Sequence, residues 1–174
     1  MQDRHSTAIH EAGHAVIARV LGLTCGSATI IPNEDEDEAG HALIADPWKT
    51  ASDWDQALME AVERGGSFRC HDARSAFRGR IIAMMAGAEA ENELLGRCSG
   101  GDWHDRTEIE WMAASRATKF PDDLWQRYEP RMRRQTRRLV HKHRDKIERI
   151  AAALLEHDTL HPDEIETLIM PARR

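Results

Sequence analysis

Two histidines and a glutamate near the start of the sequence have types and a spacing that could hold a metal ion. His10, Glu11 and His14 stand in the stretch H-E-A-G-H, which has the pattern H-E-x-x-H. Residues four apart lie on one face of an α-helix, about 6 Å apart along its axis, so both imidazoles can bind one zinc ion. Glu11 is rotated by about 100° from His10 and can stand beside the metal, where a carboxylate can accept a proton from water. The pattern therefore indicates a zinc site with Glu11 as general base.

The alternative interpretation is that the two histidines are solvated side chains on an exposed helix face. Their face continues into Ile17 and Leu21, which belong to the apolar stripe of the same helix. The pair therefore lies beside the buried stripe, where a histidine without a partner is costly. This position favours a metal site.

A catalytic zinc site needs a third protein ligand and an open position for water. The sequence after the first helix lacks H-x-x-G-x-x-H, which excludes the metzincin arrangement. Two segments offer donors, one in a helix and one in a glycine-rich turn that can approach another helix closely. The candidates are Glu89, Glu91 and Glu93 in A-G-A-E-A-E-N-E-L-L-G, and Asp102, His104 and Asp105 in G-G-D-W-H-D. The residue types alone leave this choice open.

The elements that must position these residues are predicted to be mostly helical. Apolar residues at helical spacing predict a first helix over 6–21, and the apolar run I-I-A-M-M-A-G-A predicts a buried helix over 72–95. Further helices are expected from Ser52 to the glycines at 65–66, and over 102–118, 122–157 and 161–170. Pro130 is expected at a kink or at the first position of a new helix. Pro162 is expected near the start of the last one.

Two short apolar stretches predict a β-hairpin. S-A-T-I-I-P and G-H-A-L-I-A read as strands joined by the acidic loop N-E-D-E-D-E-A, which we interpret as a solvated loop. The expected fold class is therefore mainly α with a small β-hairpin. The sequence shows no internal repeat and no long linker, and its 174 residues suit one domain, residues 1–174.

Composition narrows the class of protein. A charged share of 31% and a net charge of -6 fit a helical globular protein with solvated outer faces and make nucleic acid an unlikely partner. The three cysteines, Cys25, Cys70 and Cys98, are odd in number and irregularly spaced, which indicates no disulfide framework. No apolar stretch is long enough for a membrane span, and the first twenty residues do not resemble a secretory signal. We expect a cytoplasmic protein.

A strongly basic segment precedes the C-terminal region. In Q-R-Y-E-P-R-M-R-R-Q-T-R-R-L-V-H-K-H-R, Arg131, Arg134 and Arg138 recur at helical spacing. An anionic partner could bind there, but the interpretation that we prefer is a solvated helix face that balances the acidic loop. His141 and His143 are two apart and so point to different sides of a helix, which makes them poor candidates for zinc ligands.

Several of these stretches together resemble a known family. They occur in the order seen in the peptidase domain of FtsH-type zinc metalloproteases. In chain order the stretches are H-E-A-G-H-A-V-I-A-R-V-L-G with A-T-I-I-P, then A-G-A-E-A-E-N-E-L-L-G, then S-G-G-D-W-H-D, and finally H-R-D-K-I-E-R-I-A-A-A-L-L-E-H-D-T-L-H-P-D-E-I. The resemblance implies an FtsH-like peptidase fold around the H-E-x-x-H helix. It also implies that His10, His14 and Asp105 bind Zn²⁺ and that Glu11 is the catalytic carboxylate.

The sequence departs from the family at two places near these residues. Ala88 replaces the arginine of the family's G-R-A-A-E-E, and D-W-H-D replaces A-S-N-D, which places His104 where the family has asparagine. FtsH proteases also carry transmembrane segments and an ATPase module before the peptidase domain, whereas this sequence begins almost at the zinc helix. We therefore expect a stand-alone peptidase domain, with a separate ATPase as a candidate partner and a homo-oligomer as a candidate assembly.

The resemblance implies a zinc-dependent endopeptidase whose substrates are flexible or unfolded polypeptides. The same chemistry with Glu89 or Glu91 in place of Asp105 is one alternative. The other is a non-catalytic zinc-binding sensor or adaptor that contacts a partner through the basic segment. Glu11 argues against the adaptor, because metal binding alone does not need that carboxylate.

Overall fold

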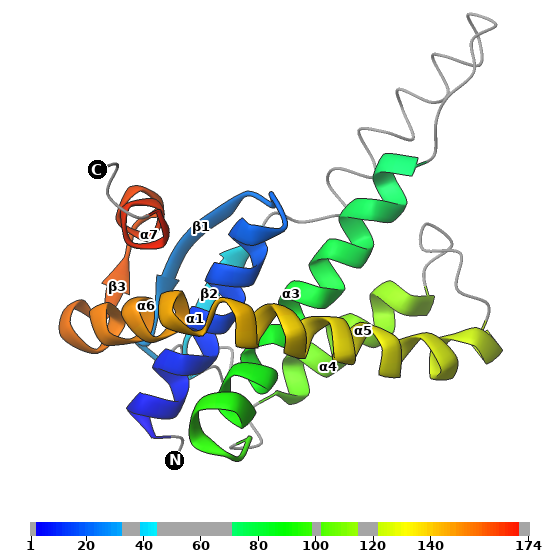
Figure 1. Cartoon of the computed structure of the whole chain (residues 1–174), viewed down its shortest axis with the longest axis horizontal. Helices are drawn as coiled ribbons and strands as arrows, with labels where there is room; N and C mark the ends of the chain where they lie inside the picture. Colours follow the sequence, from blue (N-terminus) through cyan, green and yellow to red (C-terminus); the bar gives the residue numbers. More distant parts are fainter. Residues whose placement is uncertain (1–2, 33–38, 45–70, 99–101, 115–121, 171–174) are drawn as a thin grey trace, which may run out of the picture.

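The computed structural model of the chain describes residues 3–32, 39–44, 71–98, 102–114 and 122–170 (Figure 1). The helix expected from Ser52 and the acidic residues of the expected loop lie outside these ranges. In chain order the described elements are α1 (Arg4–Val20), β1 (Cys25–Thr29), β2 (His41–Ile44), α3 (His71–Leu95), α4 (Trp103–Ala114), α5 (Asp122–Lys142), α6 (Arg144–His157), β3 (Thr159–Leu160) and α7 (Pro162–Ile169). The mainly helical class predicted from the sequence is confirmed for the described residues.

Helix α1 lies at the centre of the core. It packs against α3 on one side and α6 on the other, and the sheet covers it from a third direction (Figure 1). Nearly every side chain from Ser6 to Ala18 is buried. Gly13 allows α1 and α3 to approach closely, since a Cβ there would lie 2.6 Å from the carbonyl oxygen of Ala86 and 2.8 Å from Cβ of Ala90. The centre of α3 is buried as its apolar sequence predicted.

The predicted hairpin is part of a three-stranded antiparallel sheet with strand order β2-β1-β3. Ala28 pairs with Ala42 of β2 on one side and with Leu160 of β3 on the other. The expected hairpin is present as the antiparallel pair β1 and β2. Strand β3 was not predicted, because it has only two residues and no alternating pattern could reveal it. The sheet anchors the chain beside α1, and β2 is an edge strand.

Several helix ends agree with their sequence signals. Gly22 and Gly96 follow α1 and α3 with φ values of 75° and 71°, a left-handed conformation that glycine adopts without strain. Pro162 begins α7, and the backbone N–H of His161 donates to the Glu164 carboxylate at 2.8 Å. These caps fix where the helices end.

The long helix predicted over 122–157 is divided, but at a different residue from the one expected. Pro130 lies inside α5 on its exposed side, where water can satisfy the carbonyl that loses its N–H partner. The division falls at His143, whose φ of -113° and ψ of 19° leave the helical region. Helix α5 packs on α3, and α6 packs on α1. Helix α4 is described to Ala114, so the last residues of the helix expected over 102–118 lie outside the description.

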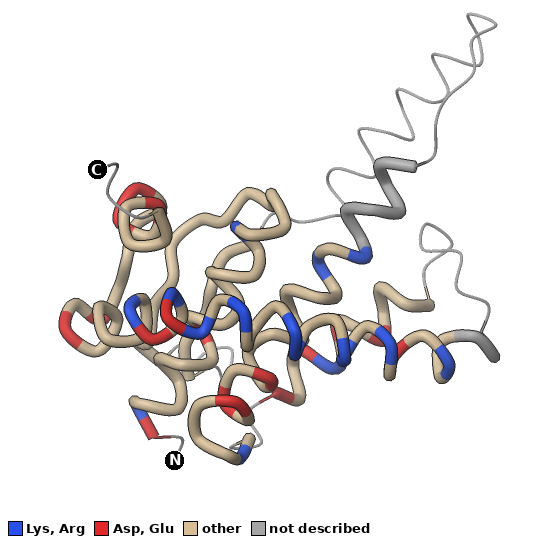
Figure 2. Tube along the Cα trace, in the orientation of Figure 1, with Lys and Arg blue, Asp and Glu red and all other residues tan. Residues whose placement is uncertain are grey.

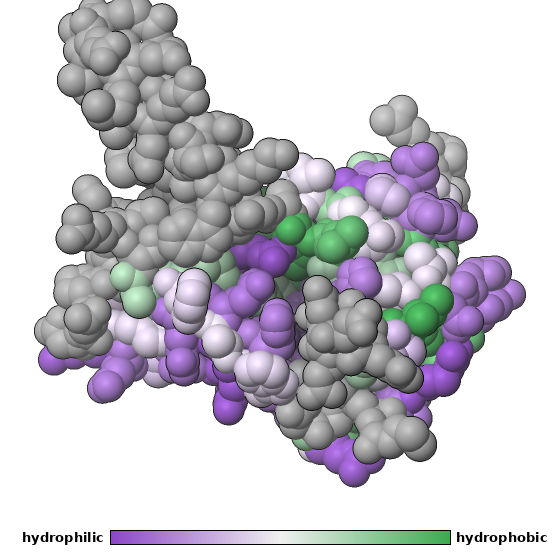
Figure 3. All heavy atoms as spheres, turned by 180° about the vertical axis from the view of Figure 1, so that it is seen from behind, coloured by the Kyte–Doolittle hydropathy of each residue, from purple (hydrophilic) through white to green (hydrophobic). Residues whose placement is uncertain are grey.

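The described surface is largely hydrophilic. Seen from behind, hydrophobic side chains form only a few separate areas (Figure 3). The large hydrophobic residues with substantial exposure are Ile31, Leu43, Trp103, Trp111 and Met170. Among the helices in the described parts of the chain, none combines the length and the apolar character that a membrane span requires.

Candidate metal centre

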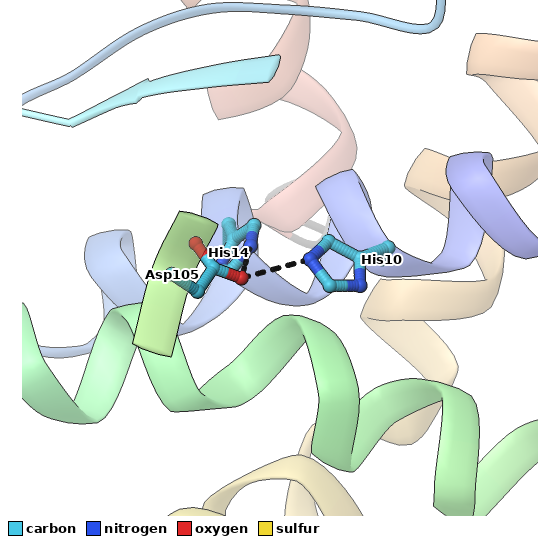
Figure 4. A group of neighbouring side chains, drawn as sticks. All are labelled: His10, His14 and Asp105. Atoms are coloured by element: carbon cyan, nitrogen blue, oxygen red, sulfur yellow. Dashed lines mark hydrogen bonds and ion pairs between the residues drawn. The ribbon is translucent and has the colours of Figure 1, made fainter. Parts of the chain in front are cut away.

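Helix α1 and the first turn of α4 bring three side chains that can bind a metal to one point (Figure 4). His10 and His14 lie one turn apart on α1, and Asp105 projects from α4 towards both. Oδ2 of Asp105 lies 3.0 Å from Nε2 of His10 and 3.1 Å from Nε2 of His14. Residues almost a hundred positions apart in the sequence thus converge as the family resemblance implied.

The outer nitrogen of each imidazole is held by a different acceptor. Nδ1 of His10 lies 2.6 Å from Oε1 of Glu91, and Nδ1 of His14 lies 2.8 Å from the backbone carbonyl oxygen of Ala83. The carbonyl only accepts, so Nδ1 of His14 must donate, and a carboxylate favours the same role for His10. Ser6, one turn before His10, donates its hydroxyl to Oε2 of Glu91 at 2.7 Å. These contacts orient both rings so that Nε2 faces the centre.

The donor set fits a zinc ion. When Nδ1 of a neutral imidazole carries the proton, Nε2 has a lone pair, and here that lone pair faces the Asp105 carboxylate. Two such electron-rich atoms repel each other unless a cation lies between Nε2 and the carboxylate oxygen. Two imidazole nitrogens and one carboxylate oxygen are ligands that zinc takes in catalytic sites. Donors at 2.0–2.1 Å from a tetrahedral ion stand about 3.3 Å apart, close to the observed 3.0 and 3.1 Å.

In the protein without metal, the surrounding carboxylates favour protonation of both imidazoles. Burial lowers the pKa of His10, but hydrogen bonds to Asp105 and Glu91 outweigh it and hold that pKa well above its ordinary value. Burial likewise lowers the pKa of His14, and the charge of Asp105 outweighs it, so that this pKa is also raised. Burial raises the pKa of Asp105, but the charge of His14 and hydrogen bonds with both rings leave it below its ordinary value. The site is therefore built around positive charge.

Glu11 stands beside this cluster without a hydrogen-bond partner among the described residues. Its side chain is buried, with 6% of the residue exposed, and within the described residues it forms neither a hydrogen bond nor an ion pair. Burial raises its pKa, and the charges of His14 and His10 oppose the rise. A buried carboxylate next to the metal-binding rings, with its oxygens uncommitted, can accept and return a proton.

Helix α3 passes close to Nε2 of both imidazoles at Gly87. A Cβ at this position would lie 2.5 Å from Nε2 of His10 and 2.6 Å from Nε2 of His14. Any side chain at residue 87 would therefore collide with the atoms that face the metal. Sequence reasoning did not single out Gly87, although a glycine inside a helix costs about 1 kcal/mol relative to alanine and so indicates a packing or functional reason.

The other candidate ligands named from the sequence engage different partners. Glu91 supports Nδ1 of His10 instead of facing the centre. The remaining four form ion pairs elsewhere: Glu89 with Arg137 at 2.7 Å, Glu93 with His141 at 2.8 Å, Asp102 with Arg106 at 3.0 Å, and His104 with Glu108 at 3.7 Å. Among the described residues, only His10, His14 and Asp105 form a cluster that could hold a metal ion.

Comparison with known proteins gives distant similarities. The chain is 25% identical over 99% of its length to ATP-dependent zinc metalloprotease FtsH 2 of Sphaerobacter thermophilus, and 29% identical over 96% to FtsH 1 of Symbiobacterium thermophilum. It is 26% identical over 97% to FtsH 2 of Methylacidiphilum infernorum. The chain spans 28–29% of the length of these relatives. No family model matches the chain. These relatives are named as ATP-dependent zinc metalloproteases.

Proposed function

We propose that residues 1–174 form one zinc metallopeptidase domain that hydrolyses peptide bonds in flexible or unfolded polypeptides. His10, His14 and Asp105 hold the ion in this proposal, and Glu11 is the general base. The observation that carries it is the convergence of both Nε2 atoms on the Asp105 carboxylate, with each Nδ1 engaged by an outer acceptor. The distant similarity to FtsH proteases agrees with it.

Each residue has a defined task in the reaction. Zinc, when bound, lowers the pKa of a water molecule and polarises the scissile carbonyl. Glu11 takes a proton from the attacking water and delivers it to the leaving amine. Glu91 and the carbonyl of Ala83 keep the imidazoles in the tautomer that leaves Nε2 free. Asp105 adds a negative ligand from another helix, so the site exists only when α4 is docked on α3.

The substitution Glu11→Gln tests this function. The amide has nearly the same size and cannot accept the proton, so zinc content and fold should persist while hydrolysis of casein falls by about 100-fold or more. Zinc is measured by mass spectrometry of the purified protein, and hydrolysis by release of labelled peptides. The matched control is Glu110→Gln, an equivalent change at an exposed residue of α4, which should keep activity.

Two results would contradict the proposal. Equal hydrolysis by wild type and Glu11→Gln would show that the carboxylate takes no part. Equal inactivity of both, with zinc bound and several unfolded substrates tried, would favour the zinc-binding sensor or adaptor instead.

A further inference from the structure

A row of positive charge runs along the outward face of α5. Its members follow one another at intervals of three or four residues, and all are exposed. They are Arg127, Arg131, Arg134, Arg138 and Lys142, which we call the basic stripe. The side chains that α5 buries, such as Met132 and Val140, lie on the opposite side of the helix. Figure 2 shows positive residues in blue along this helix.

The basic stripe has no acidic partner within the chain's described residues. None of its five side chains forms an ion pair there, and Arg131 lies over the ring of Tyr128 at 5.9 Å. The same helix shows the contrasting case. Arg133 pairs with Glu129 at 2.8 Å, and Arg137 pairs with the buried Glu89 at 2.7 Å. Arg133 thus has a carboxylate partner on its own helix and Arg137 has one on α3, whereas the stripe residues have none among the described side chains.

The stripe also works against the stability of its own helix. Like charges three or four residues apart repel each other, and the stripe contains four such neighbouring pairs. The helix dipole favours positive charge only in the last turn, which accounts for Lys142 but not for Arg127, Arg131 or Arg134. An arrangement that the fold does not need and that destabilises the helix indicates a binding role.

We propose that the basic stripe binds an acidic segment of a polypeptide. Neighbouring cations of the stripe are separated along the axis by about 4.5 or 6 Å, and the whole row spans about 22 Å. Side chains on one face of an extended peptide repeat about every 6.8 Å. Over about 22 Å such a peptide presents about four carboxylates, so an acidic segment lying along α5 can pair with most of the five cations. This inference does not depend on the peptidase activity.

The stripe is less suited to a nucleic acid. Binding to single strands without sequence preference combines positive charge with exposed aromatic platforms. Trp125 and Tyr128 are the aromatic residues of α5, and both are only partly exposed, because Trp125 packs against the core and Tyr128 lies beneath Arg131. The net charge of -6 also repels a long polyanion, whereas a short acidic segment meets mainly the local charge.

The test measures binding of two labelled probes to the full chain at low salt. One probe is a fluorescein-labelled oligoglutamate long enough to span the stripe, about 22 Å. The other is an oligothymidylate of similar length. Fluorescence anisotropy should show binding of oligoglutamate that weakens as salt rises, because exposed ion pairs are screened. Arg134→Glu combined with Arg138→Glu should weaken it by about tenfold or more.

The control reverses two exposed arginines outside α5. Arg78→Glu combined with Arg97→Glu changes the net charge by the same amount and should leave oligoglutamate binding nearly unchanged. Circular dichroism checks that both double variants are folded. Absence of oligoglutamate binding by the wild type, or an equal loss in both doubles, would overturn the proposal. Tighter binding of oligothymidylate would also overturn it, because the occupant would then be a nucleic acid. Salt-sensitive self-association that the stripe variant abolishes would overturn it too, because the occupant would then be a second copy of the chain.

Discussion

Replacing Gly87 by alanine should destroy metal binding while leaving the fold in place. The added Cβ would stand 2.5 Å from Nε2 of His10 and 2.6 Å from Nε2 of His14, whereas ordinary contacts begin at 3.4 Å. Restoring that separation requires shifts of 3.4 - 2.5 = 0.9 Å and 3.4 - 2.6 = 0.8 Å. Zinc sites tolerate deviations of only about 0.2 Å in ligand distance.

The expected loss of zinc affinity exceeds that of a missing outer hydrogen bond, which is about 10- to 100-fold. The helix itself gains, since alanine is favoured over glycine inside a helix by about 0.8–1.0 kcal/mol. Competition with a chromophoric chelator measures the affinity, and thermal melting followed by circular dichroism reports the fold.

Gly79→Ala is the matched control on the same helix. A Cβ there meets only the side chain of Leu23, at 3.5–3.8 Å, so the helix gains the same propensity and the site is untouched. We expect zinc affinity equal to the wild type for this variant. A Gly87→Ala protein that binds zinc as tightly as Gly79→Ala would refute the placement of the two imidazoles against α3.

Three further predictions concern the same cluster. Asp105→Ala should weaken zinc affinity by more than about 100-fold, which exceeds the loss expected when a residue that only hydrogen-bonds to a ligand is removed. Equilibrium dialysis against buffered zinc measures the affinity. Ser6→Ala should weaken zinc binding by about tenfold without unfolding the chain, because Glu91 loses a buried hydrogen bond. The effect should be smaller than that of Glu91→Ala, and a larger one would contradict the role given to Ser6. The metal-free protein should lose thermal stability as the pH rises above 6.5. The folded state raises the pKa of His10 and of His14, so their protonation stabilises the fold fully below pH 6.5. This contribution disappears as the pH passes the raised pKa values. Melting curves in chelator from about pH 6 to 9 check the sign, and a flat profile would contradict it.

The part of the site that local periodicity controls was predictable from the sequence. The four-residue spacing of His10 and His14 predicts that both rings face one point, and the helix is buried as its apolar neighbours indicated. Asp105 was different, because spacing left six candidates for a third ligand. Only the order of motifs in a family resemblance favoured it, and the structure places it opposite both rings.

What the sequence did not reveal depends on contacts between distant segments. Ser6 was expected only as the start of a helix, and its bond to Glu91 spans 85 residues. Gly87 is one small residue in a run of small residues, and its role follows from how closely α3 passes α1. The two-residue strand β3 is likewise defined by its pairing with β1 instead of by its own pattern. Such features belong to the packing of elements, which hydrophobic periodicity does not determine.

The most direct test of the proposed metal centre is a crystal structure of the zinc-loaded protein with an anomalous difference map recorded at the zinc absorption edge. We predict one strong peak, within bonding distance of Nε2 of His10, Nε2 of His14 and a carboxylate oxygen of Asp105, with Glu11 beside it and not among the ligands. No peak at this point, or a peak held by Glu89, Glu91 or His104 while Asp105 turns away, would contradict the account.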